Sequence, residues 1–119
     1  MRFMMLLKLD PTRVPQTGPD EKLMREVGEL IEEMTKAGVL LDTAGLRPLD
    51  EAVRIRQVGG RQTVLDGPFA EAKEMIGGYC LLQTKDRDEA VQWASRFLAL
   101  HGDEWEIEAE VRRTEGAEL

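Results

Sequence analysis

Hydrophobic residues follow a strand-like pattern in four parts of the chain. Residues 2–8 and 75–82 are nearly continuous apolar runs, which are typical of strands buried on both faces. Residues 105–111 alternate strictly between apolar and acidic residues, which predicts a strand with one dry and one wet face. Residues 39–46 form a further extended segment, interrupted near its end by glycine and proline.

Two amphipathic helices separate these strands. Apolar residues recur at helical spacing between Asp20, which is a suitable N-cap, and Gly38, which is a natural stop. The same arrangement recurs between Asp86 and Gly102. The chain therefore contains the order strand, helix, strand twice.

A hairpin is inserted between the two halves. Residues 52–58 alternate apolar and polar side chains, which favours an edge strand. Gly59-Gly60 is a two-residue turn signal, and residues 61–65 form the returning strand. A repeated βαβ unit is the ferredoxin-like plan. We therefore predict one α+β domain over residues 1–119, with an antiparallel sheet and a hairpin insert.

The central strands also predict a partner. Both helices of a ferredoxin-like fold cover the same face of the sheet, yet residues 3–7 are apolar on both faces. Met4 and Leu6 would then lie on an uncovered face, and large exposed apolar patches are unusual on monomers. A second copy of the sheet is the obvious cover, so we predict a homodimer.

Composition and charge exclude several functions. The 119 residues carry a net charge of −7, which disfavours nucleic-acid binding. The acidity is concentrated in residues 103–119, where a solvated face and a frayed end are expected. One Cys and one His leave no set of metal ligands of the usual kinds, and nothing indicates a cofactor. Without a targeting or membrane-spanning run, a cytoplasmic location is expected.

One motif carries a family resemblance. Residues 65–74 read Leu-Asp-Gly-Pro-Phe-Ala-Glu-Ala-Lys-Glu and lead into Ile76-Gly77-Gly78-Tyr79. With the opening strand and the helix after Asp86, this block resembles the DGPF branch of the YCII-related family. The resemblance implies a dimeric α+β barrel of ferredoxin-like protomers, and it implies no settled reaction.

Asp66 is the candidate catalytic acid, base or anchor at this motif. Gly67 and Pro68 restrict the backbone around it, and Phe69 is expected to anchor the turn. Two roles are open for the carboxylate. It either accepts N–H bonds from Phe69 or Ala70 as a turn residue, or faces a cleft and binds substrate. Glu71 and Glu74 follow closely and either extend an acidic rim or are simply solvated.

The wider family implies a histidine paired with this aspartate. No histidine is present in residues 9–36, and the single one is His101, at the end of the second helix. The sequence departs from the family's pattern here. A Cys80–His101 pair is the alternative dyad, but an inert buried thiol and a helix-capping histidine are the simpler interpretation.

Arginines near the hairpin form a candidate ligand-binding cluster. Arg54 and Arg56 share one face of their strand, and Arg47 and Arg61 lie close in sequence. Three roles are open for them: an anion site in the barrel mouth, pairs with acidic residues of a dimer mate, or a solvated edge. The acidic residues in question are Glu106, Glu108 and Glu110.

Two functions fit these observations. One is a dimer that binds or transforms a small organic molecule beside Asp66, with Arg54, Arg56 and Phe69 as ligand-binding residues. The other is a non-catalytic interaction or regulatory module on the same dimer. Whether the protein is an enzyme is left open, because the missing histidine favours the second function and the rigid carboxylate favours the first.

Overall fold

A computed structural model describes residues 1–69 and 75–115 of the chain. Two helices, one short 3-10 helix and six strands make up this part. In chain order they are β1 (Arg2–Leu9), α1 (Glu21–Lys36), β2 (Leu40–Gly45), η1 (Leu49–Glu51), β3 (Val53–Val58), β4 (Arg61–Asp66), β5 (Met75–Gln83), α2 (Arg87–Ala99) and β6 (Ile107–Arg113).

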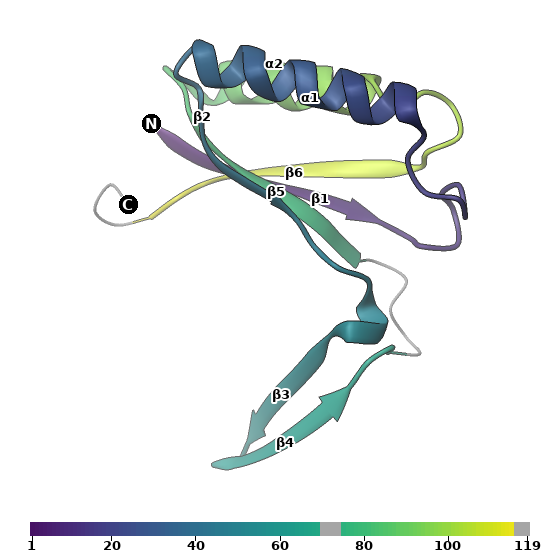
Figure 1. Ribbon diagram of the computed structural model, residues 1–119. Coiled ribbons are helices and arrows are strands. Elements are labelled where there is room, and N and C mark those ends of the chain that lie inside the picture. The colour runs from purple at the N-terminus through teal and green to yellow at the C-terminus, as the bar shows by residue number, and fades with distance from the viewer. Residues whose placement is uncertain (70–74, 116–119) are drawn as a thin grey trace.

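Four strands form one antiparallel sheet in the order β2-β5-β1-β6. The two apolar runs of the sequence are its central strands, β1 and β5. Both helices lie on the same side of this sheet (Figure 1). This is the predicted ferredoxin-like α+β fold, and the prediction is confirmed.

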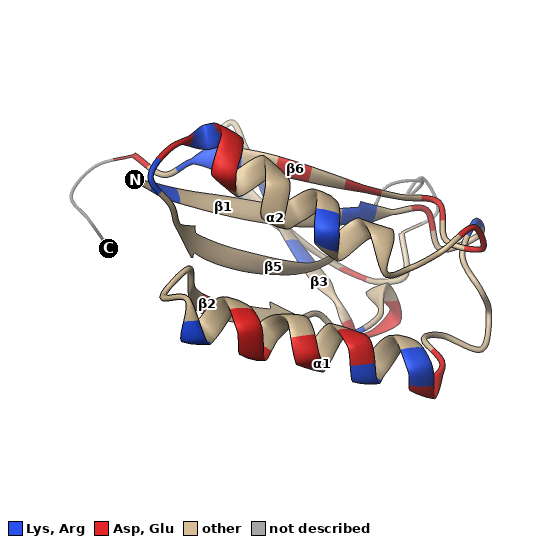
Figure 2. Ribbon diagram, turned by 90° about the horizontal axis from the view of Figure 1, so that it is seen from above, with Lys and Arg blue, Asp and Glu red and all other residues tan. Residues whose placement is uncertain are grey.

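Both helices begin at the predicted caps. The Asp20 carboxylate accepts the backbone N–H of Leu23 at 2.8 Å, and the Asp86 carboxylate accepts that of Glu89 at 2.9 Å. Each bond satisfies one of the backbone donors that a helix leaves unpaired at its start. Charged residues follow one another along the outer surface of α1 (Figure 2), so its apolar stripe is free to face the sheet.

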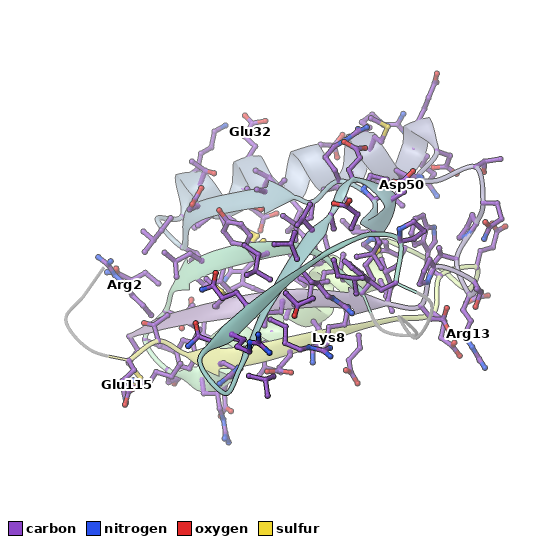
Figure 3. All side chains as sticks on the ribbon, turned by 90° about the horizontal axis from the view of Figure 1, so that it is seen from below. Arg2, Lys8, Arg13, Glu32, Asp50 and Glu115 are labelled. Carbon is purple, nitrogen blue, oxygen red and sulfur yellow. The ribbon has the colours of Figure 1, made fainter. Side chains whose placement is uncertain are left out.

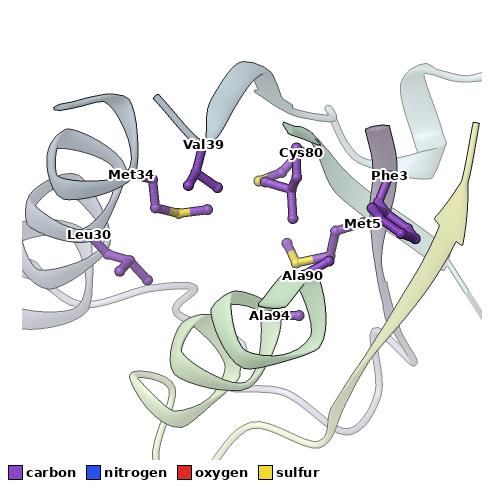
Figure 4. Close-up of a cluster of buried hydrophobic side chains, with 9 residues drawn as sticks. Phe3, Met5, Leu30, Met34, Val39, Cys80, Ala90 and Ala94 are labelled. Carbon is purple, nitrogen blue, oxygen red and sulfur yellow. The ribbon is translucent and has the colours of Figure 1, made fainter. Parts of the chain in front are cut away.

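The core lies between the helices and the inner face of the sheet (Figure 4). Phe3 and Met5 of β1 stand directly opposite Leu82 and Cys80 of β5 on this face. Leu82 is 0% exposed. The helices contribute small residues as well as large ones, since Ala90 and Ala94 let α2 pack closely on the sheet.

The opposite, open face of the sheet is partly apolar, as the sequence predicts. Met4 lies opposite Leu81 and Leu6 opposite Tyr79, and these four side chains are half-buried. No helix of the described residues covers this face (Figure 1). We call these four residues the open-face patch.

The predicted hairpin forms, with Gly59-Gly60 as its turn, but its place in the fold differs from the prediction. We expected residues 52–58 to be an edge strand of the main sheet. Instead β3 pairs only with β4, in a separate two-stranded sheet, and every residue of both strands is exposed. Figure 1 shows this hairpin projecting to the side of the sheet opposite the helices. We call it the arm (residues 53–66).

The last strand begins later than predicted. It starts at Ile107 rather than Trp105, so Trp105 and Glu106 precede it. The Trp105 ring instead meets His101 edge-on, with ring centroids 5.5 Å apart. From Ile107 onward the predicted alternation holds, because Ala109 and Val111 pack on the core and Glu108 and Glu110 lie on the open face.

No helix in the described ranges is long and apolar enough to cross a membrane.

Candidate functional site

The Asp66-Gly67-Pro68-Phe69 turn lies at the base of the arm and is held against η1. The Gly67 N–H donates to the Ala52 carbonyl at 2.8 Å. A Cβ built on Gly67 would lie 1.9 Å from the Leu49 carbonyl oxygen, which no side chain tolerates. Close approach of two backbone segments therefore requires glycine at this position. The motif is thus a tightly packed corner between the arm and the body.

Asp66 ends β4 with an exposed carboxylate. No hydrogen bond or ion pair joins this carboxylate to another residue that the structure describes. The expected turn bond from Phe69 is therefore not formed, and Ala70, the other expected donor, lies outside the described residues, as do Glu71 and Glu74. A carboxylate at a fixed corner that no other described residue engages is suited to accept hydrogen bonds from a ligand.

Phe69 is buried, at 7% exposure, as the sequence predicts. Its partner is one of the candidate arginines: the guanidinium carbon of Arg54 lies 3.7 Å from the centre of the Phe69 ring. Stacking of a planar cation on an aromatic face stabilises both groups. This contact fixes the base of the arm to the turn and orients Arg54.

The other arginines divide into two groups. Arg56 lies on the same face of the arm as Arg54. Arg61 shares this face, because it stands opposite Val58, which comes two residues after Arg56. Arg47 belongs elsewhere, since its guanidinium is bound to Glu51 of η1 at 2.8 Å. The basic face of the arm is therefore formed by Arg54, Arg56 and Arg61.

The register of the arm separates the predicted site residues. Asp66 stands opposite Val53, and the pair Ile55–Val64 shares this face. Arg54 and Arg56 occupy the other face. The structure thus brings Phe69 and Arg54 together, and it places the Asp66 carboxylate on the apolar face of the arm, away from the arginines.

Cys80 and His101 have separate structural partners. The Cys80 thiol lies 3.3 Å from the Thr43 hydroxyl, and burial raises the pKa of the thiol. His101 Nδ1 lies 3.0 Å from the Phe97 carbonyl oxygen, and burial lowers the pKa of the imidazole. A neutral thiol is a poor nucleophile, so these contacts favour the packing and capping roles for the two residues.

Two polar pairs on or beside the open face were missed by sequence reasoning. Lys8 Nζ binds Glu110 at 2.6 Å, which lowers the pKa of that carboxyl group. The Tyr79 hydroxyl donates to the Asp42 carboxylate at 3.0 Å, and this bond raises the pKa of the phenol. Figure 3 views this side of the sheet, with Lys8 labelled. Each pair joins strands distant in sequence, so only the strand order reveals it.

In residues 1–69 and 75–115, no three His, Cys, Asp or Glu side chains gather in a way that would hold a metal ion.

Comparison with known proteins supplies a family. The family model for the YCII-related domain matches residues 1–106. The chain is also similar to an uncharacterised protein of Rhizobium meliloti (strain 1021), with 37% identity over 75 residues. That alignment covers 63% of this chain and 60% of the relative, so the chain spans less than two thirds of the relative's length.

Proposed function

The chain belongs to the YCII-related domain family, and from this premise we propose that it acts as a homodimer that binds a small organic molecule beside Asp66. The block at residues 65–74 supports its assignment to the DGPF branch of that family. A cytoplasmic location is part of the same proposal. The observation that carries it is the arm, whose apolar face is left exposed by the residues that the structure describes.

A two-stranded hairpin is marginally stable unless it packs against something. Ile55 and Val64 are 66% and 64% exposed, and Val53 beside them is also exposed. Covering these side chains would stabilise the arm, because each buried aliphatic side chain contributes about 1.5–3 kcal/mol. The arm is therefore built to pack against a second molecule.

The shape of the chain supports the same conclusion. Its radius of gyration is 16.1 Å, whereas a compact chain of this length has about 13–14 Å. The arm and the open face of the sheet enclose an angle in Figure 1. A second copy placed in this angle would cover the open-face patch, and we assign the apolar face of the arm to the same interface.

Charge favours a second copy as the occupant. The arm contains three arginines and one aspartate, so its net charge is +2. Because the whole chain has a net charge of −7, the remaining residues together carry −9. Figure 2 shows acidic positions along β6. A basic arm that meets an acidic body of its mate is attracted at long range, which sets orientation more than affinity.

In this dimer the Asp66 carboxylate lies at the edge of the arm's apolar face, where the mate would enclose it. A carboxylate accepts hydrogen bonds, so the ligand would present N–H or O–H donors to Asp66 and apolar surface to Val53 and its neighbours. Arg54 and Arg56 would contact an anionic group of the ligand, or carboxylates of the mate, on the other face.

We expect Asp66→Asn to fold normally and to lose ligand binding. Asparagine keeps the size of the side chain but removes its charge. Loss of a charge-assisted hydrogen bond should lower the affinity for the ligand by about tenfold or more. The measurement is a thermal-shift screen of small polar organic molecules on both proteins. Asp50→Asn, an exposed aspartate on η1, is the matched control. A ligand that binds wild type and Asp66→Asn equally well would refute the site.

A second candidate is an interaction module. The exposed apolar residues of the arm favour it, because they offer a protein partner a ready surface. In that case the screen finds no ligand that depends on Asp66, and the arm rather than the turn is the functional element.

The basic face gives a prediction of its own. We expect Arg54→Glu with Arg56→Glu to weaken dimerisation chiefly at low salt, where repulsion from the acidic mate is least screened. Each rim pair is worth only ~0–1 kcal/mol, so the effect is modest at physiological salt. Sedimentation at two ionic strengths measures it.

A compensating charge reversal identifies which glutamate of the mate faces Arg54 and Arg56. Glu106 and Glu110 are bound to Arg13 and Lys8 of their own chain, whereas Glu108 has no ion pair within the described residues. Adding Glu108→Arg to the double mutant should therefore restore part of the lost affinity. Equal dimerisation of wild type and double mutant at low salt would show that the arginines do not face the glutamates.

A further inference from the structure

A cavity of about 170 Å³, open to solvent on the side of the exposed Ala44 and Gly45, lies between the inner face of the sheet and the two helices. Its sheet wall is formed by neighbouring segments of β2 and β5, including Thr43, Gly45, Gly78 and Cys80, and Val27 and Ile31 of α1 cover it. It is separate from the Asp66 turn, none of whose residues lines it.

A pair of glycines accounts for the cavity. Along the inner face, Cys80 stands between Met5 and Thr43 in the register, and one step further Gly78 stands between Leu7 and Gly45. No side chain rises from the sheet at either glycine, so the space beneath α1 is left unfilled. At Gly78 the backbone prevents filling, because an added Cβ would lie 2.9 Å from the Ala44 carbonyl oxygen. An added Cβ at Gly45 meets nothing within 4 Å.

The polar end of the cavity is formed by Thr43. Its hydroxyl donates to the Tyr79 carbonyl at 2.9 Å and contacts the Cys80 thiol at 3.3 Å. A hydroxyl has one proton and two lone pairs. With the proton committed to Tyr79, the Cys80 thiol is the donor in the second contact and occupies one lone pair. The other lone pair of the Thr43 oxygen is left to accept a hydrogen bond from a ligand.

The remaining lining selects against charge. Val27, Ile31, Leu7 and Phe97 are apolar, and the lining contains no Lys, Arg, Asp or Glu. An ionised ligand would lose its hydration here without gaining an opposite charge. An enclosed apolar cavity of about 150 Å³ accepts benzene, so the volume of this open-sided cavity is sufficient for one aromatic ring.

We propose that this cavity is a binding site for a neutral, hydroxyl-bearing molecule the size of a single aromatic ring. The ring lies over Gly45 and Gly78 beneath α1, and the hydroxyl donates to the Thr43 oxygen. The site does not include Asp66 or require dimerisation, so a test of this proposal is independent of the function proposed above.

Phenol is the probe, and benzene is the matched probe that lacks the hydroxyl. Titration of the protein, followed by two-dimensional NMR, should give saturable shifts of the Val27 and Ile31 methyl groups with millimolar affinity or tighter. Phenol should bind about tenfold more tightly than benzene, which is the usual range for one additional hydrogen bond. Absence of saturable shifts with both probes would overturn the proposal.

Filling the cavity should abolish binding. Gly45→Leu places a side chain in the open space over the sheet, whereas Gly28→Leu adds the same group at an exposed position of α1 with no neighbour within 4 Å. We expect loss of phenol binding only in the first variant. If Gly45→Leu fails to fold, Ile31→Phe fills the same cavity from the helix side. Full binding by either folded variant would overturn the proposal.

The Thr43 hydroxyl is tested by substitution with a side chain of the same shape. Thr43→Val should reduce phenol affinity to that of benzene and leave benzene affinity unchanged, while Thr43→Ser should retain the preference for phenol. The same readout on Asp66→Asn should equal wild type. A preference for phenol that persists in Thr43→Val would remove Thr43 from the site.

Discussion

Replacing Gly67 with alanine is expected to lower the free energy of unfolding by about 3 kcal/mol, the upper part of the range for forced overpacking. The added methyl group would overlap the Leu49 carbonyl oxygen, 1.9 Å away, and approach that of Ala52 at 3.1 Å. Both are backbone atoms, so relief requires η1 and the base of the arm to move apart. Urea denaturation monitored by circular dichroism measures the change.

The control is the same substitution at Gly28. This glycine is exposed in the middle of α1, and an added Cβ meets nothing within 4 Å. Gly28→Ala should raise the stability by about 1 kcal/mol, because alanine favours the helix more than glycine does. Equal changes in the free energy of unfolding of the two variants, in the same direction, would contradict the claim that the Gly67 turn is closely packed against η1.

The second large effect is expected on the arm. Ile55→Asp combined with Val64→Asp should weaken dimerisation by at least about 100-fold, because two aliphatic side chains would no longer be buried and two charges would have to be desolvated. The two residues stand opposite each other on one face of the arm. Both are exposed in the single chain, so the fold of each protomer should be unaffected. Sedimentation equilibrium measures the dimer dissociation constant.

Met24→Asp provides the control for the arm. Met24 is 63% exposed on α1, on the side of the sheet away from the arm. An acidic residue near the start of a helix is tolerated well. This variant should dimerise like wild type. Normal dimerisation of the arm double mutant would show that the apolar face of the arm is not part of the interface.

Local patterns in the sequence were sufficient to predict the main sheet. The apolar runs that became β1 and β5 have polar residues only near their ends, which is the pattern of central strands. Asp20 and Asp86 mark helix starts because the bonds they accept lie within three residues. Such short-range requirements are readable without a structure.

The direction of the arm was not predictable in the same way. The alternation at Val53, Arg54, Ile55 and Arg56 is correct for a strand, but it does not say which strand lies beside it. An edge strand of the main sheet and a free hairpin have the same pattern. The short η1 segment and the close contact at Gly67 decide between them by turning the chain away from the sheet.

The candidate site was predicted in its residues but not in its arrangement. Asp66 and Arg54 are close in the fold, yet the two-residue period of the arm places them on opposite faces. That separation follows from the register of β3 with β4. The length of the turn fixes this register, but only once it is known that β3 pairs with β4. The Arg54–Phe69 stack joins a strand to a later turn, and no sequence period indicates such a contact.

The mass of the wild-type protein in solution tests the central claim, that a second copy covers the arm and the open face. Sedimentation equilibrium at micromolar concentration should give twice the chain mass of 13.4 kDa. A single species of 13.4 kDa under the same conditions would contradict the account, because the arm and the open-face patch would then have no partner.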